Sequence, residues 1–72
     1  MKKEILIKFG KRVRDKRMEL GFSQEELASR AGVHRTYIGM IERAEKNITL
    51  ENIEKVSKAL NLELSDFFRN FH

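Results

Sequence analysis

The chain has 72 residues, of which 40% are hydrophobic and 36% charged, and its 15 Lys and Arg against 11 Asp and Glu give a net charge of +4. A chain of this length forms one small domain that buries only about 60% of its unfolded surface, so an enclosed substrate cavity is not expected. The absence of Cys excludes disulfides and zinc–thiolate sites and fits a reducing cytoplasm. Its longest apolar run, residues 5–7, is far shorter than the roughly 20 residues of a membrane span. We therefore expect a cytoplasmic protein that acts through its surface.

A helical stripe opens the chain and predicts the first helix. Its members recur at intervals of three and four residues and stop before Gly21: Leu6, Phe9, Val13, Arg17 and Leu20. One member, Arg17, is charged, and a charge on a buried face needs a partner.

Two further helices are predicted around Gly32. Ser23 opens a capping box, in which its side chain accepts from the Glu26 amide and Glu26 reaches back to the Ser23 amide. This second helix is about two turns long and ends at Gly32, and a third follows after a very short turn. The two share one inner face: Leu27, Ala28, Ala31, Val33, Ile38 and Ile41. The outer face of the third helix buries nothing within the domain: His34, Arg35, Thr36, Gly39, Met40 and Arg43.

The C-terminal half predicts two more helices. Thr49 is the expected N-cap of a fourth helix, whose inward stripe is Leu50, Ile53, Val56 and Leu60. Ser65 or Asp66 starts a fifth, which carries Phe67, Phe68 and Phe71. No stretch alternates with period two for long enough to form a strand, and no Pro or linker divides the chain. The prediction is a single all-α domain, residues 1–72, of five short helices.

Residues 24–43, QEELASRAGVHRTYIGMIER, have the pattern of a helix-turn-helix, whose second helix enters the DNA major groove by its N-terminal residues. At these residues the chain resembles the Cro-type, lambda-repressor-like (XRE) regulators, and the resemblance covers roughly residues 9–68. SQEELASRAGVHRTYIGMIER followed by KNITLENIEKVSKAL is most similar to the controller proteins of bacterial restriction–modification systems. One departure is Ala44, where many relatives have Gly. Because Ala tolerates a left-handed conformation poorly, we expect the third helix to continue or the turn to differ.

The outer face of the third helix is expected to read bases. Arg35 lies in the first turn, and its planar guanidinium can donate two hydrogen bonds to guanine, so base contact is favoured over phosphate contact alone. Thr36 is expected at a thymine methyl or a phosphate, and Tyr37 either binds a phosphate or simply packs. Gly39 would let the groove approach closely, and Met40 would make apolar contact.

Phosphate contacts are expected on both sides of this face, from Ser23, Gln24, His34, Arg43, Lys46 and Asn47. Ser23 and Gln24 stand at a helix N-terminus, where free amides and the dipole suit an anion. Ser23 as a cap alone is the alternative, and the two roles are compatible. Residues 1–20 carry eight Lys and Arg against three Asp and Glu, which is either a footprint for phosphates or a solvated basic helix.

Two structural expectations complete the site. The family resemblance implies that Arg17 pairs with Glu42 and ties the first helix to the third. The C-terminal part, about residues 60–72, is more apolar than a short helix can bury, and it suggests a homodimer interface: Leu62, Leu64, Phe67, Phe68 and Phe71. Leu62, Leu64 and Phe67 can instead complete the core, which leaves the Phe68 and Phe71 side for the interface. A two-fold dimer places its recognition helices about 34–36 Å apart and predicts a palindromic operator.

The expected function is a homodimeric transcriptional regulator of restriction–modification genes that binds double-stranded operator DNA. It is expected in the bacterial cytoplasm, associated with the nucleoid through DNA binding. RNA polymerase is a further candidate partner, and no cofactor, metal, membrane or small-molecule ligand is expected. An enzyme is disfavoured, because the carboxylates are scattered and His34 lies far in sequence from His72, without a nucleophile–base pair or metal spacing. The alternative is a protein-binding module or antitoxin-like partner that uses the same fold. Binding that weakens steeply with salt would favour DNA.

Overall fold

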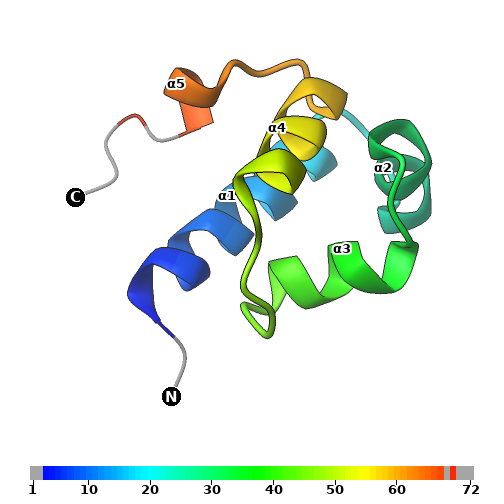
Figure 1. Cartoon of the computed structure of the whole chain (residues 1–72). Coiled ribbons are helices and arrows are strands. Elements are labelled where there is room, and N and C mark those ends of the chain that lie inside the picture. The colour runs from blue at the N-terminus through cyan, green and yellow to red at the C-terminus, as the bar shows by residue number, and fades with distance from the viewer. Residues whose placement is uncertain (1–2, 68, 70–72) are drawn as a thin grey trace.

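Five helices make up the fold in the computed structural model, which describes residues 3–67 and 69. They are α1 (Glu4–Glu19), α2 (Gln24–Ala31), α3 (Arg35–Glu42), α4 (Leu50–Ala59) and α5 (Leu64–Phe67). The described residues contain no strand, so the predicted all-α class and the five helices are confirmed (Figure 1).

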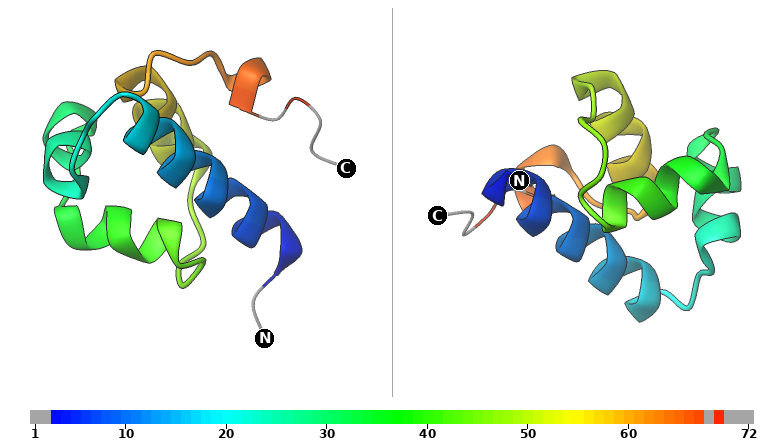
Figure 2. Two further views of the ribbon diagram at one scale, coloured as in Figure 1. Left: turned by 180° about the vertical axis from the view of Figure 1, so that it is seen from behind. Right: turned by 90° about the horizontal axis from the view of Figure 1, so that it is seen from below.

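Four pairs of helices make the main contacts. α1 packs against α3, α3 against α2, α2 against α4, and α4 against α5. α2 and α3 form one end of the molecule, and α5 lies at the other (Figures 1 and 2). α3 is therefore held on its inner side by both α1 and α2, and its outer side is left to solvent.

The core confirms most positions of the predicted inward stripes, although Leu6 is only partly buried and is not part of it. α1 to α4 contribute its buried apolar side chains: Phe9, Val13, Leu27, Ala28, Ala31, Ile38, Ile41, Ile53, Val56 and Leu60. Leu50 was expected to belong to this set, but it is 80% exposed. It is the first residue of α4, directly after the N-cap, and lies one turn before the part of the helix that faces the core.

The predicted caps are present, but the capping box is only half formed. The Ser23 hydroxyl accepts from the Glu26 amide at 2.9 Å, and Thr49 accepts from the amide of Asn52 at 3.1 Å. The Glu26 carboxylate accepts instead from Arg30 Nε at 2.6 Å, so the expected return to the Ser23 amide is wrong.

The fifth helix begins at Leu64, earlier than the predicted Ser65 or Asp66. Asp66 stands in the third position of the helix rather than at its start. From there its Oδ2 accepts from the backbone amide of Glu63 at 3.4 Å. Glu63 directly precedes the helix and so stands at its N-cap position.

The expectation that α3 continues past Ala44, or that its turn differs, is wrong. Ala44 takes the left-handed conformation itself, with φ of 59°. The Glu45 amide donates to the Met40 carbonyl at 2.9 Å and the Ala44 amide to the Ile41 carbonyl at 3.0 Å, which is a Schellman motif. The left-handed conformation costs about 1–2 kcal/mol for a residue with a Cβ. Burial of the Ala44 methyl group, at 6% residue exposure, offsets part of this cost.

Gly10 sets the distance between α1 and α3. A Cβ at this position would overlap the carbonyl oxygen of Ile41 and lie 3.1 Å from that of Glu42. The backbones of the two helices therefore meet directly, and α1 fixes the C-terminal end of α3.

Candidate nucleic-acid interface

α3 presents the face that the sequence predicts. Ile38 and Ile41 are buried, whereas Arg35 and Thr36 are exposed and Met40 is partly exposed. The side chain of Arg35 is 68% exposed at the N-terminal end of the helix. Its guanidinium is thus available to a ligand outside the domain.

His34 is the N-cap of α3, a role that the sequence did not predict. Its ring Nδ1 accepts from the Thr36 amide at 3.1 Å. In the neutral ring this leaves the proton on Nε2. Nε2 can then donate a hydrogen bond to a phosphate oxygen. The cap and the predicted phosphate contact are compatible.

Tyr37 packs, as one of its two open interpretations predicted. It is partly buried against the core, and its hydroxyl oxygen accepts from Asn52 Nδ2 at 3.1 Å. The hydroxyl proton is still available for donation, so a phosphate contact by Tyr37 stays a prediction.

Gly39 differs from the expectation that it opens the helix to the groove, because it is buried. A Cβ there would lie 3.0 Å from Arg43 Nη1 and 3.5 Å from Gln24 Oε1. The missing side chain makes room for the polar ends of these two residues, which lie over the helix at this point.

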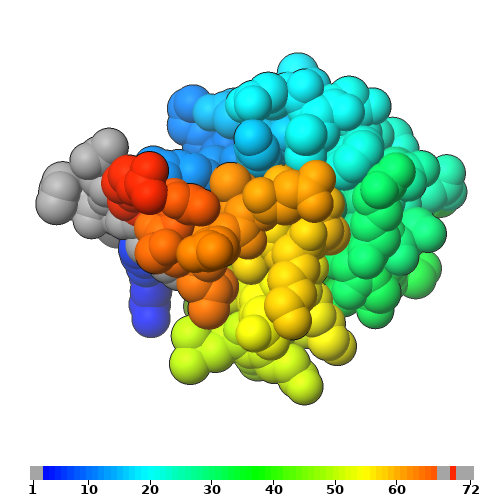
Figure 3. Space-filling model, turned by 90° about the horizontal axis from the view of Figure 1, so that it is seen from above, coloured from blue at the N-terminus to red at the C-terminus, as the bar shows by residue number. Residues whose placement is uncertain are grey.

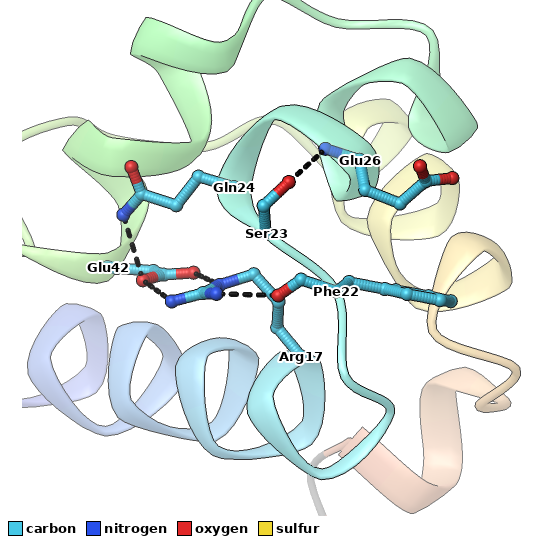
Figure 4. Close-up of polar contacts among 6 residues, drawn as sticks. All are labelled: Arg17, Phe22, Ser23, Gln24, Glu26 and Glu42. Carbon is cyan, nitrogen blue, oxygen red and sulfur yellow. Dashed lines mark hydrogen bonds and ion pairs between the residues drawn. The ribbon is translucent and has the colours of Figure 1, made fainter.

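The expected pair of Arg17 and Glu42 is present and bidentate (Figure 4). Arg17 Nε lies 2.7 Å from Glu42 Oε2 and Nη2 lies 3.1 Å from Oε1, while Nη1 donates to the Phe22 carbonyl at 2.8 Å. The two side chains are only 13% and 4% exposed.

Gln24 extends this network toward the surface. Its Nε2 donates to Glu42 Oε1 at 3.1 Å, so the buried pair holds the side chain at the start of α2 (Figure 4). This contact joins the first residue of α2 to the last residue of α3. No periodic pattern in the sequence relates these two positions. Only the crossing of the two helices reveals it.

The cations around the face are held by exposed carboxylates. Arg35 Nη1 lies 3.8 Å from Glu25 Oε2, and Arg43 Nε lies 3.0 Å from Glu45 Oε1, with all four side chains at least 44% exposed. Exposed pairs of this kind are worth about 0–1 kcal/mol, so a phosphate or a base edge can replace either carboxylate. Lys46 and Asn47, also predicted phosphate contacts, are exposed in the turn after α3.

The predicted dimer residues divide between core and surface. Leu62 packs against the core, whereas Leu64 is 41% exposed beside a shallow hollow of about 370 Å³. The side chain of Phe67, and Phe68 and Phe71 entirely, lie outside the described residues.

Arg12 positions the C-terminal segment, and the sequence analysis missed it. From α1 its Nη1 donates to the carbonyl oxygens of Asp66 at 3.4 Å and Arg69 at 3.0 Å. The segment accordingly lies between α1 and α4 (Figure 3).

Two further features of the described residues bear on the kind of site. Within residues 3–67 and 69, no three or more His, Asp or Glu side chains gather where they could hold a metal. None of the helices formed by these residues has the length and apolar character needed to cross a membrane.

Comparisons with known proteins agree with this geometry. The helix-turn-helix family model HTH_3 matches residues 13–67. Control protein C.BamHI of Bacillus amyloliquefaciens is 46% identical over 67 residues, which span 92% of this chain and 83% of that protein. The crystal structure of the restriction–modification controller protein C.AhdI from Aeromonas hydrophila has a TM-score of 0.85 at 44% identity, over 88% of this chain and 96% of that one.

The restriction–modification controller protein C.Esp1396I has been solved as a tetramer in complex with its natural 35 base-pair operator. It matches this chain with a TM-score of 0.87 at 35% identity, over 92% of this chain and 87% of that one. These matches confirm the resemblance found in the sequence. The chain belongs to the XRE-type helix-turn-helix family, and within it is similar to the controller proteins of restriction–modification systems.

Proposed function

We propose that the protein is a sequence-specific DNA-binding transcriptional regulator that controls restriction–modification genes. The observation that carries this proposal is α3, whose inner side is locked into the core while its outer side presents an exposed arginine at its N-terminal end. A helix held in this way can enter the major groove without distorting the domain. The similarity to controller proteins supports the choice of genes.

In this proposal, residues of α3 and its flanks share the work of recognition. Arg35 donates two hydrogen bonds to a guanine, and Thr36 and Met40 contact neighbouring base edges. Phosphates on the two sides of the groove are bound by Ser23, Gln24, His34, Arg43, Lys46 and Asn47. These phosphate contacts fix the register of the protein on DNA without reading its sequence.

We further propose that the protein binds as a homodimer through its C-terminal part. The exposed Leu64, next to its hollow, supports this interface. The operator complex of the similar C.Esp1396I, which is a tetramer, supports self-association on DNA. Two-fold symmetry then calls for a palindromic operator with half-sites about one turn, or 34–36 Å, apart.

Dimerisation gives the regulator a response to its own concentration. Both dimer formation and the filling of adjacent operator sites increase with the amount of protein, so a switch needs no bound small molecule. RNA polymerase is a further candidate partner, and the cytoplasm, where the operator lies, is the proposed place of action. We propose no catalytic role.

The first experiment is selection from a random DNA pool with purified protein, followed by titration of the selected sequence at several salt concentrations. A short palindrome bound far more tightly than random DNA is expected. Arg35→Ala should lose about 1–3 kcal/mol of discrimination at one base pair of each half-site. Arg30→Ala, the same change on the last turn of α2, is the control and should keep the preference.

Weak binding without sequence preference would overturn the proposal that the protein recognises an operator. The protein-binding alternative would then be tested by its salt response, because DNA binding weakens steeply with salt through counterion release, whereas an apolar protein contact changes little.

A further inference from the structure

A second basic surface lies on α1, beside the end of α3. A concavity of about 450 Å³ opens there, lined by Ile7, Lys11, Arg14, Asp15, Glu42, Arg43 and Ala44. The start of the turn between α3 and α4 lies beside α1, because Arg43 and Ala44 line the concavity together with residues of α1. The close approach at Gly10 makes this turn and α1 parts of one rigid surface.

The charges around the concavity leave one cation uncompensated. Lys11 Nζ lies 2.6 Å from Asp15 Oδ2, and the Glu42 carboxylate is held by Arg17 at 2.7 Å. Both carboxylates of the lining are therefore already neutralised. Arg14 is exposed, and its side chain makes no hydrogen bond or ion pair with any residue that the structure describes. The concavity thus offers positive charge to a ligand.

Arg43 connects this concavity to the recognition face. It lines the concavity, and its Nη1 lies 3.0 Å from the position that a Cβ on Gly39 of α3 would occupy. Arg43 therefore lies between the outer side of α3 and the concavity that Arg14 lines. A polyanion that follows the end of α3 would next meet this part of α1, and the backbone of the operator is such a polyanion.

We propose that Arg14, together with Lys11 and Arg43, binds the DNA backbone next to each half-site, beyond the C-terminal end of α3. This site rests on the proposed function, and it extends the phosphate contact already proposed for Arg43 by two residues of α1, Arg14 and Lys11. Its ligand is a phosphate of the DNA backbone, so it increases affinity for every sequence and leaves the choice of sequence to α3.

The test is Arg14→Gln in the full chain, measured on the selected operator and on random DNA. We expect about three- to tenfold weaker binding to both. The slope of log K against the logarithm of the salt concentration should become shallower by about 0.9 for each subunit. Sequence preference should stay unchanged. Lys55→Gln is the matched control, because Lys55 is exposed on α4 and lines neither surface. It should keep the salt dependence of the original protein.

Neutral methylphosphonates in the DNA locate the contact. Replacing the phosphates just outside the half-sites should weaken binding by the original protein more than binding by Arg14→Gln, which keeps only Lys11 and Arg43 at this site. Equal weakening of both proteins would show that Arg14 does not touch these phosphates.

The outcomes separate this inference from the proposed function. If the original protein binds no DNA, the proposed function fails, and this site fails with it. If the original protein binds its operator and Arg14→Gln keeps the same affinity and salt dependence, only the α1 site is overturned. Thermal unfolding followed by circular dichroism checks that the exposed substitution leaves the fold intact.

Discussion

Arg17 and Glu42 form a polar joint inside an otherwise apolar contact between α1 and α3. The carboxylate is 4% exposed and accepts from both Arg17 and Gln24, so its charge is compensated by direct hydrogen bonds. Removing one member of such a pair leaves a buried charge without its counterion, which is more costly than the pair is stabilising.

Arg17→Met should therefore lower the free energy of unfolding by about 3–5 kcal/mol. Urea denaturation measures this loss. Lys11→Met is the control, because it breaks an exposed pair on the same helix and should cost less than about 1 kcal/mol. A second change, Glu42→Leu in the Arg17→Met protein, should restore part of the stability by removing the orphaned carboxylate. Unchanged stability of Arg17→Met would contradict this account.

The helices end in one common way, and their ends determine how sharply the chain turns. Gly21, Gly32, Ala44 and Asn61 follow or close α1 to α4, all with φ between 59° and 77°. Each left-handed residue stands one or two positions after the last residue of its helix, so the chain turns away from the helix axis at that point. Gly10 differs, since it serves packing between elements rather than a turn.

Gly10→Ala should destabilise the protein although Ala is the better helix former. Ala gains about 1 kcal/mol of helix propensity, but its methyl group must push α1 away from the Ile41 carbonyl, and overpacking of this kind typically costs about 1–3 kcal/mol. We expect a lower midpoint of thermal unfolding together with weaker DNA binding, because the end of α3 moves. Met18→Ala, at an exposed position of the same helix that lines neither proposed DNA-binding surface, should change neither. A midpoint raised by Gly10→Ala would show that the two helices separate without cost.

The molecule divides its surfaces between two ends. α2 and α3 lie at one end, and α5 lies at the other, tied to α1 by Arg12 (Figure 3). α1 spans the distance between the two ends and contacts both. In the proposed homodimer, the position of α5 on α1 sets the distance between the two recognition helices.

Arg12→Gln should consequently weaken the dimer. The guanidinium bonds to the Asp66 and Arg69 carbonyls are lost, and a hydrogen bond to a charged group contributes about 1.5–3 kcal/mol. We expect a dimer dissociation constant raised about tenfold or more, measured by sedimentation equilibrium, with the core unchanged by circular dichroism. Lys55→Gln, which removes a charge from α4, should leave the dimer as it is. An unaltered dimer would place the interface away from the segment that Arg12 holds.

Much of the fold could be predicted because its signals are local. The stripe of α1, the caps at Ser23 and Thr49 and the turn at Gly32 depend on residues within one or two turns of each other. The prediction failed at Leu50, whose spacing fits the stripe although, among the residues that the structure describes, none covers that end of α4. It also failed at Ala44. The cost of a left-handed conformation can be judged from the residue type alone, whereas the burial of the Ala44 methyl group that offsets it depends on the tertiary structure.

The same distinction applies to the proposed site. Amphipathic spacing alone determined that α3 turns its apolar side inward, and thus that Arg35 and Thr36 face out. The family resemblance added the pairing of Arg17 with Glu42, which periodicity does not contain. The placing of Gln24 and Arg43 over Gly39, and the hold of Arg12 on the C-terminal segment, were decided by tertiary structure. These contacts join side chains from different helices, and their geometry follows from how closely the helix axes approach, which no single segment of the sequence encodes.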